Sequence, residues 1–365
     1  MKIKEVGIYV VNDSRNKPTI CIEINGCGTC APSGKSTGKY EKPAYKGSIE
    51  NDIKNVKQII ELSQYNFTKF DDLKLVEKLL GNKIGANTLF ALEASILKAI
   101  AKEEGKELYQ LLKGKRIPKL LSNTVGGGVH TKGKSPDFQE FLVIGDKKQN
   151  IKVHKETMKI LKTKKINDES ACMTELENNM VLELFNYTDL QFGIDAAASE
   201  FYKNRKYYYK NPKKTLSRQD QIDYMINIIE DYGLKYVEDP LDENDFKGFA
   251  EILRRTKGKC LIVGDDLTTT NLERTKEAIK NKSINGIIIK PNQIGSLIEV
   301  KKVIDLCKKK KIKIIVSHRS GETTDDTITD LAVGWGADMI KTSVVSKERL
   351  AKVNRLEVIK RKLRR

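Results

Sequence analysis

The sequence of 365 residues has no long hydrophobic run. No apolar stretch approaches the roughly 18 residues of a membrane-spanning helix, and the apolar part of the N-terminus is too short, and too soon polar, for a signal peptide. Hydrophobic residues make up 39% of the chain, which is enough to build ordinary cores, and the length is enough for about two domains. We therefore expect a soluble cytoplasmic protein that does not enter a membrane.

Two common ligand-binding motifs are incomplete. Residues 27–30 read CGTC, but no second CxxC and no pair of histidines follows at the spacing of a zinc site. We interpret the six cysteines as neutral residues, with a redox pair or half of a zinc site as the alternative. Residues 34–36 read GKS, but the glycine that a phosphate-binding loop requires five positions earlier is Thr29. The segment 31–41 is better interpreted as a flexible lid with hydroxyl groups near a ligand.

Basic residues outnumber acidic ones, with 67 Lys and Arg against 49 Asp and Glu and a net charge of +18. This charge permits nonspecific binding to nucleic acid, and residues 360–365 (KRKLRR) are locally basic. However, the lysines are spread along the whole chain, and no helix-turn-helix, RNA-recognition or zinc-finger pattern is present. We expect a lysine-rich, solvated surface that helps to attract anionic substrates, and no nucleic-acid partner.

Six short apolar runs in the second part of the sequence each end in a charged residue or lead directly into a polar group. The steps between these polar positions are 43 residues and then 23 to 28, which fits the roughly 30 residues per unit of a (β/α)8 barrel. Such barrels carry their active sites at the carboxyl ends of the strands. The residues at these positions are Asp195, Glu238, Asp265, Lys290, His318 and Lys341.

The last two runs belong to one strand-helix-strand unit over residues 313–343, with a helix predicted over 324–333. A parallel unit of this kind places both strand ends at the same edge of the sheet. The polar groups at these two ends should therefore lie together and form a pocket for an anion. They are His318, Arg319, Ser320 and Lys341.

The first part of the sequence predicts a separate α+β domain. Residues 1–45 alternate like strands, and residues 49–112 have the helical spacing of core-facing stripes. Residues 113–118 (KGKRIP) then break the helix. We therefore predict a cap domain over residues 1–115, which carries the lid, and a barrel over residues 116–365.

Ten short motifs follow one another in the order of a known family. They are DSRNKPT (13–19), PSGKSTG (32–38), GAN (85–87), QEF (139–141), DAAASEF (195–201), EDP (238–240), GDDLT (264–268), KPNQIGS (290–296), SHRSGET (317–323) and IKT (340–342). Each motif alone is weak, but together they cover nearly the whole chain, which resembles the enolase (phosphopyruvate hydratase) family.

The resemblance implies a fold and an assembly. The barrel would begin with two strands and two helices before the regular alternation, as the enolase-type ββαα(βα)6 variant of the TIM-type (β/α)8 barrel. The lid of the α+β cap domain would close over it. The family also implies a homo-oligomer, either a homodimer or a ring of dimers.

The resemblance also implies a reaction. Enolases remove the C2 proton of 2-phosphoglycerate and expel the C3 hydroxyl, which gives phosphoenolpyruvate in glycolysis and gluconeogenesis. As is general for the enolase superfamily, a lysine or histidine is the base and one or two Mg²⁺ ions stabilise the ene-diolate. Asp195, Glu238 and Asp265 would supply oxygen ligands to the first Mg²⁺, and Ser36 on the lid would help to bind a second that arrives with the phosphate.

The remaining roles follow from the same resemblance. Lys290 would be the general base, with its pKa lowered by the two cations. Glu169 would be the general acid toward the leaving hydroxyl, Glu140 would be the second acidic residue, and His318 would assist. The substrate-binding residues would be Lys341 for the carboxylate, Arg319 and Ser320 for the phosphate, and also Ser36 and His130.

The acid side of the expected site departs from the family pattern. The family's GDEGG loop is NDESA here (residues 167–171), so the carboxylates stay and all three glycines are lost. We expect restricted backbone angles and a changed loop shape. In addition, ten residues separate His130 from Glu140, where the family usually has nine.

Two alternatives to an enolase therefore stay open. An enolase-like paralogue would dehydrate another phosphorylated or carboxylated hydroxy acid, because a changed substrate would alter the acid side. A noncatalytic protein of the same fold would use its basic surface, for example on RNA, and would bind in a salt-sensitive manner even without Asp265. Three converging acids argue against this second alternative, since a site that has lost its chemistry has no physical need for them.

Overall fold

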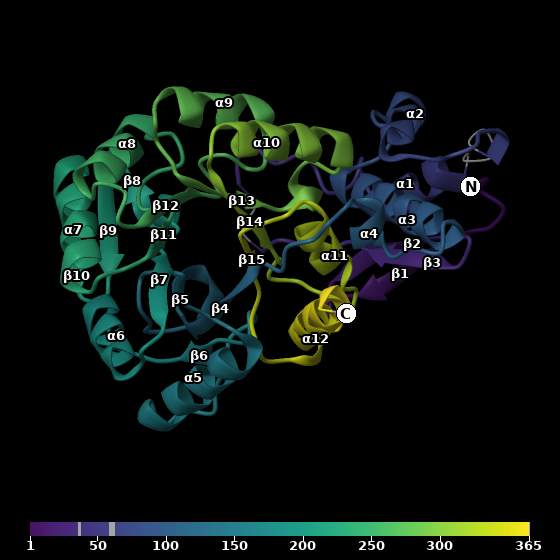
Figure 1. The fold of residues 1–365 in the computed structure, drawn as a ribbon. Coiled ribbons are helices and arrows are strands. Elements are labelled where there is room, and N and C mark those ends of the chain that lie inside the picture. The colour runs from purple at the N-terminus through teal and green to yellow at the C-terminus, as the bar shows by residue number, and fades with distance from the viewer. Residues whose placement is uncertain (36–37, 58–62, 365) are drawn as a thin grey trace.

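The second part of the chain forms a closed barrel of eight strands, in a computed structural model that describes residues 1–35, 38–57 and 63–364 (Figure 1). Strand β5 is antiparallel to both of its neighbours, the other neighbouring pairs of the ring are parallel, and the pairing of β15 with β4 closes the ring. The barrel strands are β4 (Lys119–Gly126), β5 (Glu140–Gly145), β7 (Gln191–Asp195), β11 (Tyr236–Glu238), β12 (Leu261–Gly264), β13 (Gly286–Ile289), β14 (Lys313–Ser317) and β15 (Met339–Lys341).

Helices cover the outside of this barrel, as Figure 1 shows. Two of them, α5 (Lys147–Ile160) and α6 (Asn178–Leu184), follow β5 before the regular alternation begins at β7. This order confirms the predicted ββαα(βα)6 barrel. The later helices are α7 (Arg218–Asp231), α8 (Phe246–Arg255), α9 (Leu272–Lys280), α10 (Leu297–Lys309), α11 (Thr327–Gly334) and α12 (Lys347–Leu363), and the small additional strands are β6 (Cys172–Met173), β8 (Tyr202–Lys203), β9 (Lys206–Lys210) and β10 (Lys213–Ser217).

Apolar side chains fill the interior of the barrel. The strands are short runs rich in isoleucine, valine and leucine, which can be buried on both faces as a helix-covered barrel requires. Because the interior is a packed core and not a pore, a ligand can bind only at an end of the barrel. The interior residues are Leu121, Leu142, Ile144, Tyr236, Val263, Ile288 and Ile315.

The first part of the chain packs an antiparallel sheet against one long helix. The sheet consists of β1 (Val6–Asn12), β2 (Pro18–Ile24) and β3 (Cys27–Cys30), and the long helix is α3 (Ala86–Glu103). The predicted division into domains at residue 115 would lie between this part and β4, and it stays a prediction. The remaining helices here are α1 (Ile49–Val56), α2 (Leu73–Leu80) and α4 (Leu108–Leu111).

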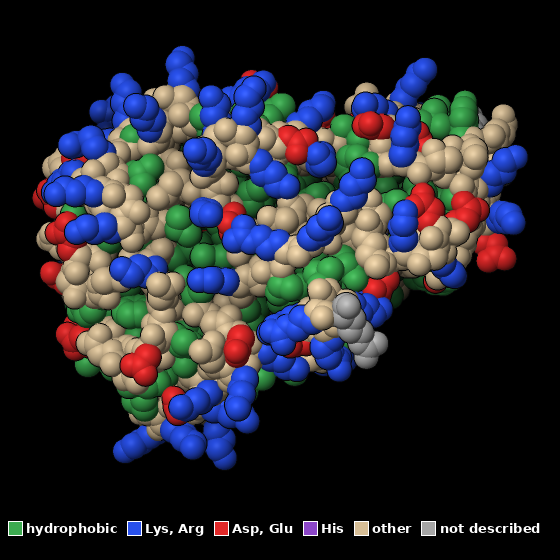
Figure 2. Space-filling view, in the orientation of Figure 1, with side chains coloured by type: hydrophobic (Ala, Val, Ile, Leu, Met, Phe, Trp, Pro, Cys, Tyr) green, Lys and Arg blue, Asp and Glu red, His purple; other side chains and the backbone are tan. Residues whose placement is uncertain are grey.

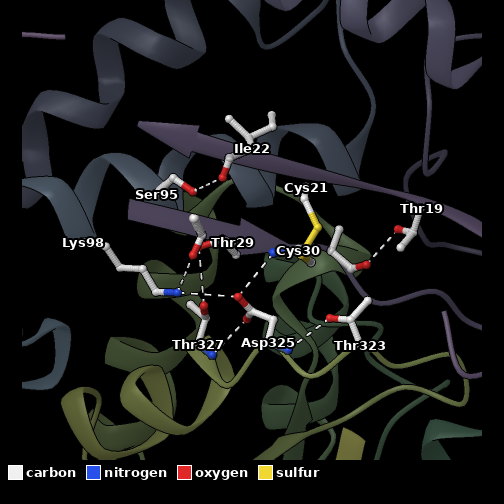
Figure 3. Close-up of a disulfide and its surroundings, with 12 residues drawn as sticks. Thr19, Cys21, Ile22, Thr29, Cys30, Ser95, Lys98, Thr323, Asp325 and Thr327 are labelled. Carbon is white, nitrogen blue, oxygen red and sulfur yellow. Dashed lines mark hydrogen bonds and ion pairs between the residues drawn. A yellow bond between two sulfur atoms is a disulfide. The ribbon is translucent and has the colours of Figure 1, made fainter. Parts of the chain in front are cut away.

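A disulfide joins two strands of the cap sheet just before the lid segment (Figure 3). Cys21 on β2 and Cys30 on β3 are directly paired residues of the two strands, so their side chains lie on the same face of the sheet. The backbone N–H of Cys30 also donates to Asp325 Oδ2 at 3.3 Å, which ties the sheet to the loop before α11. The interpretation of the cysteines as neutral residues is therefore wrong for this pair, whereas Cys27 of the CxxC motif has a free thiol.

Lysine and arginine side chains are the most frequent charged groups on the face shown in Figure 2, with acidic residues scattered among them. This distribution agrees with the expected basic, solvated surface. Among the residues that the structure describes, no helix is both long and apolar enough to cross a membrane.

Candidate active site

The predicted site residues that the structure describes lie at one rim of the barrel, around or beside a small polar cavity. Strands β7, β11 and β15 end in a predicted site residue, and β12, β13 and β14 are each followed directly by one. Glu140 is the first residue of β5, and antiparallel pairing places it opposite Asp195 at the same rim. The cavity is lined by Gly34, His130, Gln139, Glu140, Glu169, Asp195, Lys290, Ser317, His318, Arg319, Ser320 and Lys341.

The Lys341 ammonium lies among three carboxylates. Its Nζ is 3.0 Å from Asp195 Oδ2 and 2.8 Å from Glu238 Oε2, and it forms a third ion pair with Glu140. All four side chains are buried. Burial alone would lower the pKa of Lys341, but the three carboxylates raise that pKa well above its usual value. Lys341 is therefore a fixed cation at this rim.

Lys290 forms an ion pair with Asp265, and Gln293 Nε2 donates to Asp265 Oδ1 at 3.2 Å. Burial would lower the pKa of Lys290, but the Asp265 carboxylate raises it. Burial would likewise raise the pKa of Asp265, but the Lys290 ammonium holds it below its usual value. The predicted lowering of the Lys290 pKa therefore requires a bound cation that neutralises the Asp265 carboxylate in place of Lys290.

Asp195, Glu238 and Asp265 fit a divalent cation. They are buried carboxylates at the ends of three neighbouring strands, and Glu238 Oε1 has no hydrogen-bond partner among the described residues. Burial and the charge of Asp195 raise the pKa of Glu238 to about 8, so the local negative charge exceeds what its neighbours neutralise. Carboxylate oxygens are the ligands that Mg²⁺ prefers.

Two groups of potential metal ligands in the described chain are more compact than this set of three carboxylates, with ligand atoms within 4.8 Å of one another. The first group consists of Asp239, Asp265 and Asp266, so it shares Asp265 with the set. In the first group, Asp239 accepts the backbone N–H groups of Asp265 and Asp266 at 3.1 and 2.7 Å. These hydrogen bonds hold the loop after β12, so the Asp239 carboxylate has a structural use of its own. The second group lies on the acid side and consists of Glu140, Glu169 and His318.

The loop after β14 presents groups that suit an anion. Arg319 Nη2 is 3.0 Å from Glu41 Oε2, while the buried Ser320 Oγ and His318 Nδ1 atoms have no hydrogen-bond partner in the described chain. Burial and the charge of Arg349 lower the pKa of His318 well below its usual value, so its ring is neutral. A guanidinium, a hydroxyl and a neutral imidazole are suitable partners for a phosphate group.

The acid side combines two carboxylates and one histidine. Asn123 Nδ2 donates to Glu140 Oε1 at 2.9 Å and to Glu169 Oε2 at 3.4 Å, and His130 Nε2 lies 3.5 Å from Glu169 Oε1. Burial raises the pKa of Glu140 well above its usual value. Burial acts in the same direction on Glu169, but the His130 charge holds the pKa of Glu169 well below its usual value. The two carboxyl groups lie close enough to titrate as a pair, and the predicted role of Glu169 as the general acid stays a prediction.

The acid loop (residues 167–171) forms a tight turn without the family's glycines. Asn167 Oδ1 accepts the backbone N–H groups of Glu169 and Ala171, both at 3.0 Å. Ser170 has a φ of 65°, which is the left-handed conformation that glycine adopts most easily. The loss of the glycines thus leaves one strained residue, Ser170, within a turn that hydrogen bonds hold in place.

The lid contacts the acid loop through Lys35. Its Nζ is 3.1 Å from Asp168 Oδ2, and Asp168 Oδ1 in turn lies 2.9 Å from His130 Nδ1. Ser36 lies outside the described residues, so its predicted contacts with a metal ion and with substrate stay predictions.

Sequence reasoning missed two residues that contact the site. Glu41 pairs with Arg319 from the lid segment, and Asn123 connects the two acidic residues from within β4. Glu41 is the last residue of the predicted lid, and its charge was the available signal. Asn123 lies between Ser122 and Thr124 in β4, where nothing in the sequence singles it out, and only the pairing of β4 with β5 places it beside Glu140.

The fold and the rim define a class of protein, namely a (β/α)8-barrel enzyme whose rim gathers the carboxylates and cationic side chains that suit an anionic substrate and a divalent cation. A family model for the C-terminal TIM barrel domain of enolase matches residues 115–365. Curated relatives named enolase align over nearly their whole length with this chain. The relative from Methanothermobacter thermautotrophicus is 36% identical, and the alignment covers 97% of this chain and 95% of the relative. The relative from Thermoplasma acidophilum is 36% identical with 98% and 97% covered, and that from Picrophilus torridus is 37% identical with 99% of both chains covered. The chain belongs to the enolase family, whose members are lyases that dehydrate 2-phosphoglycerate to phosphoenolpyruvate.

Proposed function

We propose that this chain dehydrates 2-phosphoglycerate to phosphoenolpyruvate with Mg²⁺ as its cation. The observation that carries the proposal is that Lys290, Lys341, Arg319 and the acidic pair Glu140 and Glu169 line one cavity. The reaction needs a base, two groups that hold an anionic substrate and a proton donor, and this cavity combines all of them.

The cation would be held by Asp195, Glu238 and Asp265, with Ser36 as a ligand of a second ion. When bound, Mg²⁺ supplies positive charge to the carboxylate end of the substrate, where the ene-diolate develops. The chemistry of the three carboxylates and the unpaired Glu238 oxygen support this assignment.

The side chains of the chain perform the proton transfers. Lys290 Nζ accepts the C2 proton, and the electron pair of the broken C–H bond moves toward the substrate carboxylate as an ene-diolate. In the second step this electron pair forms the double bond to C3 as the C3–O bond breaks. The leaving hydroxyl takes a proton from the pair Glu140 and Glu169 and departs as water. Burial raises the pKa of Glu140 and so favours a proton within this pair, from which Glu169 would donate it to the leaving hydroxyl.

The remaining groups hold the substrate in place. Lys341 pairs with its carboxylate, Arg319 and Ser320 bind its phosphate, and His318 assists them as a neutral hydrogen-bonding group. His130 orients Glu169 from the adjacent loop. We also propose that the chain acts in the cytoplasm, as part of glycolysis, and as a homodimer or a ring of dimers.

Ultraviolet absorbance of phosphoenolpyruvate tests the proposal directly. Formation from 2-phosphoglycerate should require Mg²⁺, should stop in EDTA and should resume when excess Mg²⁺ is added. The variants E140Q and E169Q should each lose roughly 10²- to 10⁴-fold in rate, which is the usual contribution of a proton donor. Absence of turnover in folded protein that binds Mg²⁺ would contradict the proposal. Other phosphorylated or carboxylated hydroxy acids would then be tested, since the altered acid loop favours such a paralogue as the second candidate.

A further inference from the structure

Arg349, in the first turn of α12, connects three segments that are far apart in the sequence. Its side chain is buried, with a residue exposure of 1%. One guanidinium nitrogen, Nη2, donates to Asp168 O at 3.1 Å and to Ser320 O at 2.8 Å. The other, Nη1, donates to Ser14 Oγ at 3.2 Å. A single side chain therefore holds three backbone segments together.

Two of these segments carry groups that would act on different parts of the substrate, the leaving hydroxyl and the phosphate. Asp168 precedes Glu169 in the acid loop, and Ser320 follows Arg319 in the loop after β14, which we call the anion loop (residues 317–323). The third contact, with Ser14, reaches the turn between β1 and β2 of the cap. Because one nitrogen bonds both carbonyl groups, the distance between the acid loop and the anion loop depends on Arg349.

Arg349 has no carboxylate partner among the residues that the structure describes. In the described chain, its hydrogen-bond acceptors are two carbonyl oxygens and one hydroxyl oxygen. A buried cation without a carboxylate partner is costly, so its presence calls for a reason other than stability. Its planar fork can bond several carbonyl groups at fixed angles, which a lysine ammonium cannot reproduce.

We propose that Arg349 is a positioning residue, which fixes the acid loop relative to the anion loop so that the proton donor faces the leaving hydroxyl while the phosphate is held. This inference rests on the proposed function. Arg349 donates no hydrogen bond to the proton donor or to the phosphate-binding side chains in this role, and it positions them through the backbone. Its charge also keeps His318 neutral, an effect that R349K retains. Loss of Arg349 should therefore impair expulsion of the hydroxyl more than abstraction of the C2 proton.

Two rates measured on one substrate separate these steps. Exchange of the C2 proton of 2-phosphoglycerate with deuterium from solvent reports the action of Lys290, while absorbance reports the complete dehydration. In R349K we expect dehydration to fall roughly 10- to 100-fold, the effect of misplacing a catalytic group by about 1 Å, and exchange to change less than about threefold. An equal fall in both rates, or no fall in either, would overturn the proposal.

Arg355 provides a matched control on the same helix. It also joins distant elements, with Nε bonded to Asp330 Oδ2 at 2.7 Å and Nη1 to Glu107 Oε1 at 2.8 Å, but it contacts neither loop of the site. R355M should lower the temperature of unfolding and leave the ratio of exchange to dehydration unchanged. A changed ratio in R355M would mean that general destabilisation, and not positioning, explains the result.

A measurement without substrate keeps the inference separate from the proposed function. Amide hydrogen exchange by mass spectrometry should be faster in R349M than in the unaltered chain, by roughly tenfold, in both the acid loop and the anion loop. In R355M neither loop should change. If either loop of R349M keeps its protection, the inference fails even when the unaltered chain is an active enolase, whereas inactivity of the unaltered chain contradicts only the proposed function.

Discussion

The two sides of the active-site rim are built from different parts of the barrel. Asp195, Glu238 and Lys290 stand at the ends of parallel strands, where the place of each side chain is set by its own strand. The acid side uses the start of the antiparallel strand β5 and two loops, which carry His130 and Glu169. Its geometry therefore depends on contacts between distant segments.

The barrel scaffold therefore fixes the positions of the side chains at the strand ends, whereas the sequence and contacts of the acid loop can differ between members of the family. The carboxylate and lysine side keeps the motifs of the family, whereas the acid loop has lost its glycines and is held by Asn167, Lys35 and Arg349. Substitutions on the first side should abolish chemistry or metal binding. Substitutions on the second should change pH dependence, loop stability and the coupling of the two proton transfers.

The largest effect is expected for Lys290 on the strand side. K290M removes the proposed base, so both dehydration and deuterium exchange at C2 should fall by about 10³-fold or more. K313M is the matched control, because Lys313 pairs with Asp338 away from the cavity and is half exposed. Residual exchange at C2 in K290M that equals that of the unaltered chain would show that another group is the base.

The next largest effect concerns Glu238. Burial and Asp195 raise the pKa of Glu238 to about 8, so at pH 9 its charge destabilises the chain when no cation is bound. E238Q should therefore unfold at a higher temperature than the unaltered chain in EDTA, but should gain less stability from Mg²⁺, with an affinity at least about tenfold weaker.

Glu93 on α3 is the control for this measurement. Its pKa is also raised well above the usual value, by burial and the nearby Glu77, but it lies away from the cavity. E93Q should unfold at a higher temperature in EDTA and keep the full gain from Mg²⁺. An undiminished gain in E238Q as well would remove Glu238 from the proposed metal site.

A smaller, pH-dependent effect is expected for His130 on the acid side. Burial alone would lower the pKa of His130, but the Glu169 and Asp168 carboxylates raise it. In the unfolded chain His130 has a pKa of about 6.5, and in the folded chain its pKa is higher. The stability that these contacts give is therefore fully present below the unfolded pKa and is lost as the pH rises through the folded pKa. H130Q should cost about 1 kcal/mol more at pH 6 than at pH 9 in thermal unfolding, and an equal cost at both values would refute this link.

The smallest effect is expected at Ser170. Its left-handed φ of 65° strains a serine and not a glycine, so S170G should raise the free energy of unfolding by about 0.5 kcal/mol after the greater chain entropy of glycine is subtracted. S95G is the control, since Ser95 lies within α3, where glycine weakens the helix. Denaturant unfolding compares the two, and a loss of stability in S170G would contradict the assigned strain.

Sequence alone predicted the strand side well because its signals are local. Each of Asp195, Lys290 and Lys341 follows its own apolar run, and parallel strands of a barrel end at one rim. Once the runs are recognised, the convergence of these residues follows from topology. The order of strands and helices was predicted by family resemblance in the same way.

The contacts that sequence did not predict are those between distant segments. The pairing of Cys21 with Cys30 depends on the register of β2 and β3, and not on the CxxC spacing that drew attention to Cys27. Arg349 lies beyond the last recognised motif, and its role depends on where α12 packs. The opposite pKa shifts of Glu140 and Glu169 likewise follow from burial and from His130, neither of which a motif contains.

Closure of the barrel also sets when the enzyme can first work during its synthesis. Strand β4 leaves the ribosome long before its partner β15, which ends at Lys341. Until β15 has been made, a nascent chain exposes an unpaired edge of β4 and lacks the ammonium that Glu140, Asp195 and Glu238 share in the folded barrel. Translation that stalls before residue 341 therefore leaves a product that is inactive and prone to aggregate, and not a partly active one.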